Sequence, residues 1–198
     1  MKTLQVVKSY FEQGQVYRRS DFMKWSTAVD RHLKQLVDEK TLLKLSGGLY
    51  YYPKKTVFGQ APAHDKKLVE VFLKDKRFLL MTPNMYNSLG LGTTQLYNET
   101  IVYNYKRHGL FNLGGRKFRF VRKPHVSLEI SPEFLLIDLV DNMDKLAENK
   151  VNILERVRKK ALSMSRKTLD KEIKSYGGVK ARKFFTHVFN DERLRYGA

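Results

Sequence analysis

One face of a predicted helix near the N-terminus carries side chains that can read DNA bases. Val29, Leu33 and Leu36 fall at helical spacing and form an apolar stripe. At 100° per residue, the opposite face carries Thr27, Arg31, Lys34, Gln35 and Asp38. Arginine can fork onto a guanine edge, a glutamine amide can pair with adenine, and threonine or lysine can reach bases or phosphates. The pattern predicts base reading by the first four of these residues, and its alternative interpretation is a solvated helix face.

A second set of residues around this helix fits contacts to the DNA backbone. Positive charge beside a helix that reads bases neutralises phosphates and sets the register of the protein without reading sequence. The predicted backbone and hairpin contacts are Arg18, Arg19, Ser20, Lys24, Lys44, Ser46, Gly47 and Gly48.

Three helices and a hairpin are expected to position these residues. Apolar spacing predicts a first helix over 2–13, and Ser20-Asp21 and Ser26 can cap a second and a third helix. The period then changes to two, and Gly47-Gly48 separates two short strands, as in a β-hairpin. This order predicts a winged helix-turn-helix DNA-binding domain over 1–54, with its third helix in the major groove.

The charge of the chain favours polyanionic partners. Its 198 residues contain 38 Lys and Arg against 20 Asp and Glu, a net charge of +18. Such an excess attracts nucleic acid through counterion release and long-range steering. We expect no membrane partner, because the sequence has no 18-residue apolar run and its start does not read as a signal peptide. The absence of cysteine fits a cytoplasmic location.

The remaining residues, 55–198, are expected to form a mixed α/β domain. Asp65 can cap a helix, Arg77 to Met81 is a short apolar strand, and three β segments lie between 95 and 123. From Ser131 onward the sequence turns helical and ends in basic helices. The expected fold class is α+β: an N-terminal winged helix-turn-helix followed by a mixed α/β domain with a small antiparallel sheet and C-terminal helices.

A run of basic residues without an acid occurs in the predicted sheet. Its members are Lys106, Arg107, Arg116, Lys117, Arg119, Arg122 and Lys123. Phe118 and Phe120 alternate with Arg119, so the two phenylalanines are expected to face inward. The basic residues predict a second positive surface, which either continues a DNA path or meets RNA or an acidic protein.

The sequence shows no catalytic or metal-binding motif. Its five histidines are dispersed, and it lacks a Gly-rich phosphate loop, a GxSxG elbow and any thiol. Asp138, Asp141 and Asp144 recur at i, i+3 and i+6, which could gather carboxylates around a cation, but a solvated helix face is the favoured interpretation. We therefore expect no cofactor, no metal and no enzymatic activity.

Five blocks of sequence together resemble one known family. They are Ser26-Thr27-Ala28-Val29-Asp30-Arg31-His32-Leu33, Gly48-Leu49-Tyr50-Tyr51-Tyr52-Pro53, Phe58-Gly59, Asn87-Ser88-Leu89-Gly90-Leu91-Gly92-Thr93-Thr94-Gln95 and Gly115-Arg116-Lys117-Phe118-Arg119-Phe120. Over most of residues 1–130 the chain resembles the AbiEi family, the antitoxins of abortive-infection type IV toxin-antitoxin systems. The resemblance implies an N-terminal winged helix that represses its own operon. It also implies a C-terminal α/β domain that neutralises a nucleotidyltransferase-like toxin.

These observations predict a DNA-binding transcriptional autorepressor that also serves as an antitoxin. Its expected partners are double-stranded DNA at its own promoter and the nucleotidyltransferase-like toxin. The alternative hypothesis is a protein- or RNA-binding module whose basic second domain docks directly on an acidic partner.

Overall fold

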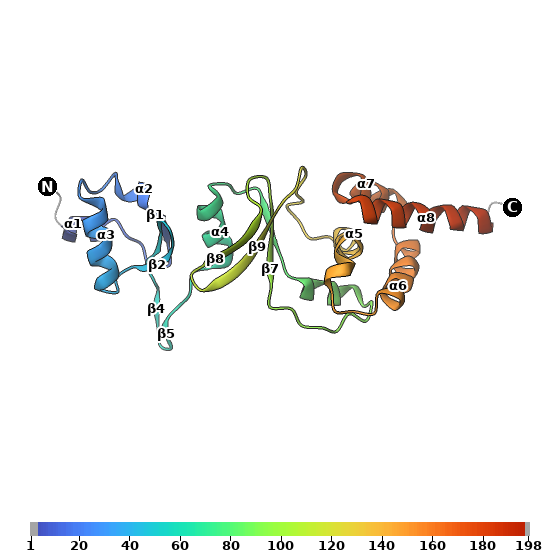
Figure 1. The fold of residues 1–198 in the computed structure, drawn as a ribbon, viewed down its shortest axis with the longest axis horizontal. Coiled ribbons are helices and arrows are strands. Elements are labelled where there is room, and N and C mark those ends of the chain that lie inside the picture. Colours follow the sequence, from blue (N-terminus) through green and yellow to red (C-terminus); the bar gives the residue numbers. More distant parts are fainter. Residues whose placement is uncertain (1–3, 197–198) are drawn as a thin grey trace. The chain divides into compact units, whose positions relative to one another are not determined.

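The computed structural model describes residues 4–196, with side chains described as far as residue 192. Contacts divide the chain into two compact units (Figure 1). Unit 1 comprises Met1–Lys76 and Lys106–Phe120, and unit 2 comprises Arg77–Tyr105 and Val121–Ala198. This division does not follow the predicted boundary at residue 54, because the two segments that follow the hairpin in unit 1 pack with the N-terminal elements. The fold is of the mixed α+β class, as predicted.

Unit 1 begins with short helices around one longer helix. The elements are α1 (Leu4–Lys8), β1 (Val16–Arg18), α2 (Arg19–Phe22) and α3 (Val29–Asp38). The first helix is shorter than the predicted span of 2–13, whose first two residues lie outside the described part of the chain. The helix ends early because the backbone from Ser9 to Phe11 forms turns rather than continuing the helix.

A β-hairpin follows α3, as the change of period predicted. Strands β2 (Leu43–Ser46) and β3 (Leu49–Tyr51) are antiparallel, and β3 also pairs with β1, which gives a sheet in the order β1-β3-β2. Ser46 is paired with Leu49, so the connection is a two-residue turn of Gly47 and Gly48. Gly48 has a φ of 68°, a conformation that glycine adopts at no steric cost.

The rest of unit 1 comprises a second small hairpin, a helix and part of a third hairpin. These elements are β4 (Lys55–Thr56), β5 (Gly59–Gln60), α4 (Asp65–Leu73), β8 (Gly109–Leu113) and β9 (Arg116–Arg122), of which β9 leaves unit 1 after Phe120. Strands β4 and β5 extend away from the three-stranded sheet (Figure 1). The sequence analysis did not predict this second hairpin. Strands β8 and β9 lie within the range 95–123, where the sequence predicted β segments, and Phe118 and Phe120 are buried, as expected.

Aromatic side chains hold the N-terminal elements of unit 1 together. Phe22 is completely buried and contacts Phe11, Tyr17 and Trp25 edge-on, with ring centroids 5.3–6.1 Å apart. Such edge-to-face pairs stabilise a core beyond the area that they bury. The apolar stripe of α3 packs into this cluster, so the opposite face of α3 is directed outward.

Unit 2 begins with a strand pair and a 3-10 helix. Strands β6 (Phe78–Met81) and β7 (Thr100–Asn104) are antiparallel, and η1 (Pro83–Leu89) lies between them in the sequence. Pro83 occupies the first turn, where its missing N–H costs nothing, and Gly90 ends η1 with a φ of 68°.

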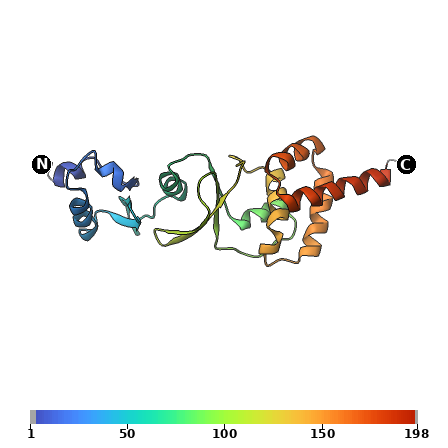
Figure 2. The ribbon, with the colours of Figure 1, turned by 45° about the horizontal axis from the view of Figure 1, so that its top comes forward.

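A central helix organises the C-terminal part of unit 2. Helix α5 (Pro132–Asn142) contacts η1, α6 (Lys150–Ser163), α7 (Arg166–Tyr176) and α8 (Val179–Tyr196) (Figure 2). Residues 134–140 of α5 are all buried, because neighbours cover the helix on every side. Ser131, where the sequence predicted the change to helix, caps α5 by accepting a hydrogen bond from the Phe134 N–H at 3.0 Å. A 3-10 turn, η2 (Met143–Lys145), follows α5.

Asp138 and Asp141 of α5 and Asp144 of η2 do not form a solvated face, and they do not converge on one site. Asp138 is buried and accepts hydrogen bonds from Tyr86 and Tyr103. Asp141 accepts from the N–H groups of Gly178 and Ala181, which caps the start of α8. Asp144 forms exposed ion pairs with Lys150 and Lys180. The prediction of a solvated face was wrong, because the sequence does not show that α7 and α8 pack along α5.

No helix in the described residues is long and apolar enough to cross a membrane.

Candidate nucleic-acid interface

The outward face of α3 presents the predicted polar side chains to solvent. Arg31, Lys34 and Gln35 are exposed, and on the opposite face Leu33 and Leu36 are buried. Within the described side chains, Arg31 and Lys34 have no hydrogen-bond or ion-pair partner. Both cations are therefore available to an anionic or hydrogen-bonding ligand.

Gln35 is already engaged in a surface contact. Its amide donates to the Glu39 carboxylate at 3.0 Å, and the same carboxylate pairs with Lys8 at 2.7 Å. These contacts lower the pKa of Glu39, with the hydrogen bond from Lys8 as the largest cause. A base that is to bind the Gln35 amide must compete with Glu39.

Thr27 lies before α3 rather than within it. The helix begins at Val29 with Ala28 at its N-cap, so the predicted cap at Ser26 is wrong. The Ser26 hydroxyl instead accepts from the Ala28 N–H at 3.0 Å and lies 2.8 Å from Nδ1 of His32. Thr27 is exposed at the N-terminal end of α3, where a helix in the major groove comes closest to base edges.

Arg19 is held against the start of α3 by a paired hydrogen bond. Its Nε and Nη2 donate to the two carboxylate oxygens of Asp30 at 2.7 and 2.6 Å. This contact lowers the pKa of Asp30 and raises that of Arg19. The Arg19 N–H also donates to the carbonyl of Gly48 at 2.9 Å. Arg19 therefore ties α2 to α3 and to the glycine turn, and it neutralises Asp30.

A shallow groove of about 190 Å³ separates α3 from the hairpin. Lys34 of α3, Lys44 of β2 and Tyr50 of β3 all line it. Lys44 is exposed and, like Lys34, has no ion-pair partner among the described side chains. Burial raises the pKa of Tyr50, which keeps its phenol neutral between the two elements. Lys34 and Lys44, which the sequence analysis predicted as DNA contacts on separate elements, thus line the same groove.

The glycine turn of the hairpin is partly covered. Gly47 is exposed, whereas Ser46 and Gly48 are half-buried. The carbonyl of Leu45, just before the turn, accepts from the Gly114 N–H at 2.8 Å. An added Cβ at Gly114 would lie 2.9 Å from the Leu45 side chain, so glycine allows this close contact. The hairpin is therefore fixed to the β8–β9 turn within unit 1.

Arg18 does not fit its predicted role as a contact to the DNA backbone. Its Nε and Nη2 donate to the carbonyls of Val71 and Phe72 at 2.6 and 2.5 Å, near the end of α4. Burial lowers its pKa from the ordinary value, and the nearby cation of Arg107 adds to the effect. By contrast, Ser20 and Lys24 of the same predicted set are exposed. Arg18 joins two elements of unit 1, while Lys24 remains accessible.

Replacing Arg18 by alanine is expected to lower the free energy of unfolding of unit 1 by about 1.5–3 kcal/mol, the range for hydrogen bonds that involve a charged group. The salt dependence of DNA binding should not change, because this guanidinium is bonded to α4. The Lys24→Ala variant is the matched control, with unchanged stability and a salt slope smaller by about one. Urea denaturation and DNA titrations at several salt concentrations measure both effects. If Arg18→Ala reduced the salt slope and left the stability unchanged, Arg18 would instead contact the DNA backbone.

The basic run between 106 and 123 does not lie on one unit. Lys106, Arg107, Arg116, Lys117 and Arg119 belong to unit 1, whereas Arg122 and Lys123 belong to unit 2. Most members make local contacts. Lys106 donates to the carbonyls at the end of α4 and pairs with Asp75. Arg107 lies over the rings of Phe72 and Phe111. Arg116 pairs with Asp65. Lys123 lies over the ring of Tyr103, 3.8 Å from Asp138.

Two exposed cations of this basic run are not engaged by an acid. Lys117 and Arg122 have no ion-pair partner among the described side chains. The number of basic residues could be read from the sequence. The sequence could not show that Asp65, Asp138 and the end of α4 would lie against several of these basic side chains. The predicted second basic surface is therefore not supported as a single surface.

A scan against protein-family models found no matching family, and a search of curated proteins found no match.

Among the described residues, no group of three or more His, Cys, Asp or Glu side chains could hold a metal ion.

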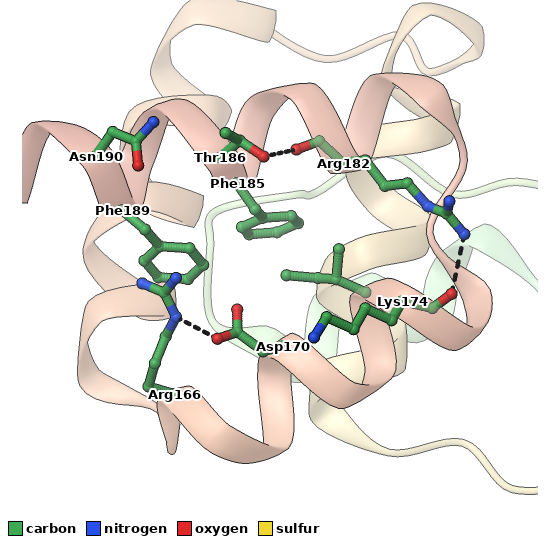
Figure 3. Close-up of a pocket in the computed structure, with 9 residues that line it drawn as sticks. Arg166, Asp170, Lys174, Arg182, Phe185, Thr186, Phe189 and Asn190 are labelled. Carbon is green, nitrogen blue, oxygen red and sulfur yellow. Dashed lines mark hydrogen bonds and ion pairs between the residues drawn. The ribbon is translucent and has the colours of Figure 1, made fainter.

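Unit 2 contains a separate concave surface between α7 and α8. It encloses about 350 Å³, with Ile173, Phe185 and Phe189 among its apolar lining (Figure 3). The Arg166 guanidinium lies over the Phe189 ring at 3.3 Å from its centroid and donates to Asp170 at 2.8 Å. The surface thus has an aromatic floor, formed by the rings of Phe185 and Phe189, beside charged side chains.

The other cations of this surface differ in how they are engaged. Arg182 donates to the carbonyl of Lys174 at 2.9 Å (Figure 3). It also donates to the carbonyl of Gly177 at 2.8 Å, so its guanidinium is held by the backbone. The Lys174 ammonium lines the groove and has no ion-pair partner in the described part of the chain. One cation at the rim is therefore available to an acidic ligand. Sequence reasoning missed this surface, because it recognised the basic helices but not their packing.

Proposed function

We propose that the protein is a sequence-specific DNA-binding regulator whose N-terminal elements act as a winged helix-turn-helix. Helix α3 enters the major groove and the β2–β3 hairpin lies along the backbone. The observation that carries this proposal is the exposed face of α3, where Arg31 and Lys34 have no partner among the described side chains. Lys34 also lines one groove with Lys44 of the hairpin. The order of three helices followed by a hairpin supports it.

Charge neutralisation around α3 supports the same function. Asp30 is paired with Arg19 and Glu39 with Lys8, so two acids that would repel phosphates are compensated. Asp38 remains the acid without an ion pair on this helix, within the described side chains. The local charge around α3 is positive, and positive charge at an exposed helix face favours duplex DNA.

The regulator acts at its own promoter and serves as an antitoxin for a nucleotidyltransferase-like toxin. This part of the proposal rests on the sequence blocks that resemble the AbiEi family. A cytoplasmic location and the lack of an enzymatic activity belong to the same proposal.

The test is binding of the full-length protein to its own promoter at several salt concentrations. About six to ten phosphate contacts give a slope of log affinity against log salt of roughly −5 to −9. The promoter fragment should bind at least tenfold more tightly than a shuffled duplex of equal length, since specific sites exceed non-specific DNA by about 10³-fold or more in typical regulators. Equal affinity for both fragments would contradict the regulator function.

A second candidate function is docking of an acidic protein on the α7–α8 groove. The aromatic floor formed by Phe185 and Phe189 and the available ammonium of Lys174 favour it. Co-purification with the product of the adjacent gene, with and without nuclease, separates the two candidates. A complex that survives nuclease supports direct docking, and one that is lost indicates a nucleic-acid bridge.

A further inference from the structure

The tip of the β4–β5 hairpin exposes two large apolar side chains. Val57 is 94% exposed and Phe58 is 99% exposed. Lys55 pairs with Gln60 and Thr56 with Gly59, so these two residues alone form the turn. Gly59 has a φ of 105°, which only glycine adopts readily, and this conformation sets the tight turn. A fully exposed phenylalanine at a turn gains nothing for the stability of the isolated chain.

The hairpin is anchored firmly at its base. The Ala61 N–H donates to the Lys54 carbonyl at 2.9 Å, and the Tyr51 hydroxyl donates to the Ala61 carbonyl at 3.0 Å. Thr56 Oγ1 donates to the Gly59 carbonyl at 2.9 Å and braces the turn. Because Tyr51 belongs to β3, the hairpin is fixed to the sheet that carries the DNA-facing hairpin. A strand advances about 3.3 Å per residue, so the arm can carry Val57 up to about 13 Å from the buried Pro53.

The charge around this tip indicates a polyanionic partner. Between Glu39 and Asp65 the sequence contains four lysines and no acidic residue. Lys54 and Lys55 lie at the base of the hairpin, are exposed, and have no ion-pair partner among the described side chains. An apolar tip flanked by unpaired cations suits a polyanion that also offers apolar surface, and duplex DNA has both phosphates and stacked bases.

We propose that Phe58, with Val57 beside it, inserts as a wedge between stacked base pairs from the minor groove of the bound DNA. Lys54 and Lys55 then contact the phosphates that flank the inserted step. Apolar wedges of this type unstack a base step and bend the duplex, and pyrimidine–purine steps yield most easily. The inference rests on the proposed function, because it needs DNA held by unit 1. Two side chains are too small a contact to hold two copies of the chain together, since stable interfaces bury more than about 1,000 Å².

The test uses the full-length protein and duplexes that carry the fluorescent base 2-aminopurine at successive positions. Unstacking by the wild type raises the fluorescence at one step, and end-labelled duplexes report the bend by energy transfer. Phe58→Ala should abolish both signals and weaken binding by roughly tenfold or more at an unchanged salt slope. Phe58→Trp should retain both signals. Leu96→Ala is the matched control, because Leu96 is 83% exposed but lies in unit 2.

The outcomes separate this inference from the proposed function. Unchanged affinity and fluorescence in Phe58→Ala would overturn the wedge and leave promoter recognition intact. A change from dimer to monomer in Phe58→Ala during sedimentation would also overturn it, in favour of self-association through the tip. Fluorescence that rises equally on promoter and shuffled duplexes, and is lost in Phe58→Ala, would support the wedge and contradict the sequence-specific function.

Discussion

Replacing Arg31 by alanine is expected to reduce the preference of the protein for its promoter over shuffled DNA by roughly fivefold to 150-fold. Arg31 is exposed on α3, and no hydrogen bond or ion pair engages it among the described side chains. A guanidinium in this position can donate two hydrogen bonds to one guanine, and such a pair contributes about 1–3 kcal/mol of discrimination. Competition gel shifts with promoter and shuffled duplexes at one salt concentration measure the change.

Lys44→Ala is the comparison variant for Arg31→Ala, because it removes a predicted phosphate contact instead of a predicted base contact. Lys44 lies across the groove from α3, on the hairpin that we place along the DNA backbone. A phosphate contact carries no sequence information, so this variant should weaken binding to both duplexes alike and reduce the salt slope by about one. If Arg31→Ala instead weakened both duplexes equally, Arg31 would contact phosphates, and base reading would have to lie elsewhere on the protein.

The exposed polar face of α3 could be predicted from the sequence because it depends on local periodicity. The stripe of Val29, Leu33 and Leu36 fixes which side of the helix is buried, and burial of one side exposes the other. The β2–β3 hairpin was equally predictable, since Gly47-Gly48 can form a tight two-residue turn between β-rich segments. Both features need only residues that are close in the sequence.

The roles of individual cations could not be predicted, because they depend on distant partners. Arg18 and Arg19 are adjacent and chemically identical, yet Arg18 binds carbonyls near the end of α4 and Arg19 binds Asp30. Nothing in the local sequence shows that α4 packs beside β1. The same reason explains the basic run, where Arg116 pairs with Asp65, an acid some fifty positions earlier in the chain.

The β4–β5 hairpin shows a different limit of sequence analysis. Its strands have two residues each, and its turn is Val57-Phe58, which lacks the usual turn residues. Gly59 was the available signal, because glycine next to a short β-branched segment permits the positive φ that closes the turn. A linker and a two-residue hairpin differ by few hydrogen bonds, so residue pattern alone does not separate them.

Replacing Asp138 by alanine is expected to lower the free energy of unfolding of unit 2 by about 3–5 kcal/mol, the range for removal of one partner from a buried charged network. Asp138 is 2% exposed, and its two carboxylate oxygens accept from the hydroxyls of Tyr86 and Tyr103, both at 2.7 Å. Without the carboxylate, two buried hydroxyls lose their acceptor. Urea denaturation followed by a signal from unit 2 measures the loss.

Asp144→Ala is the matched control, because Asp144 lies on the adjoining turn but forms only exposed ion pairs with Lys150 and Lys180. Exposed pairs contribute little to stability, so this variant should unfold close to the wild type. A comparable loss in both variants would show that Asp138 acts through charge on the helix surface rather than through the buried hydroxyls.

The pH dependence of the stability of unit 2 independently tests the contact of Asp138 with the two tyrosine hydroxyls. Burial raises the pKa of Asp138 above its ordinary value of 3.8, and the Lys123 ammonium and the two tyrosine hydroxyls only partly oppose the shift. A carboxyl that holds its proton more tightly in the folded state loses stabilising free energy as the pH rises from about 3.8 through the folded pKa. Asp138→Asn does not titrate, so the stability of the wild type relative to this variant should fall over that range. A relative stability that rises with pH instead would mean that the two hydroxyls and Lys123 stabilise the carboxylate by more than burial costs it.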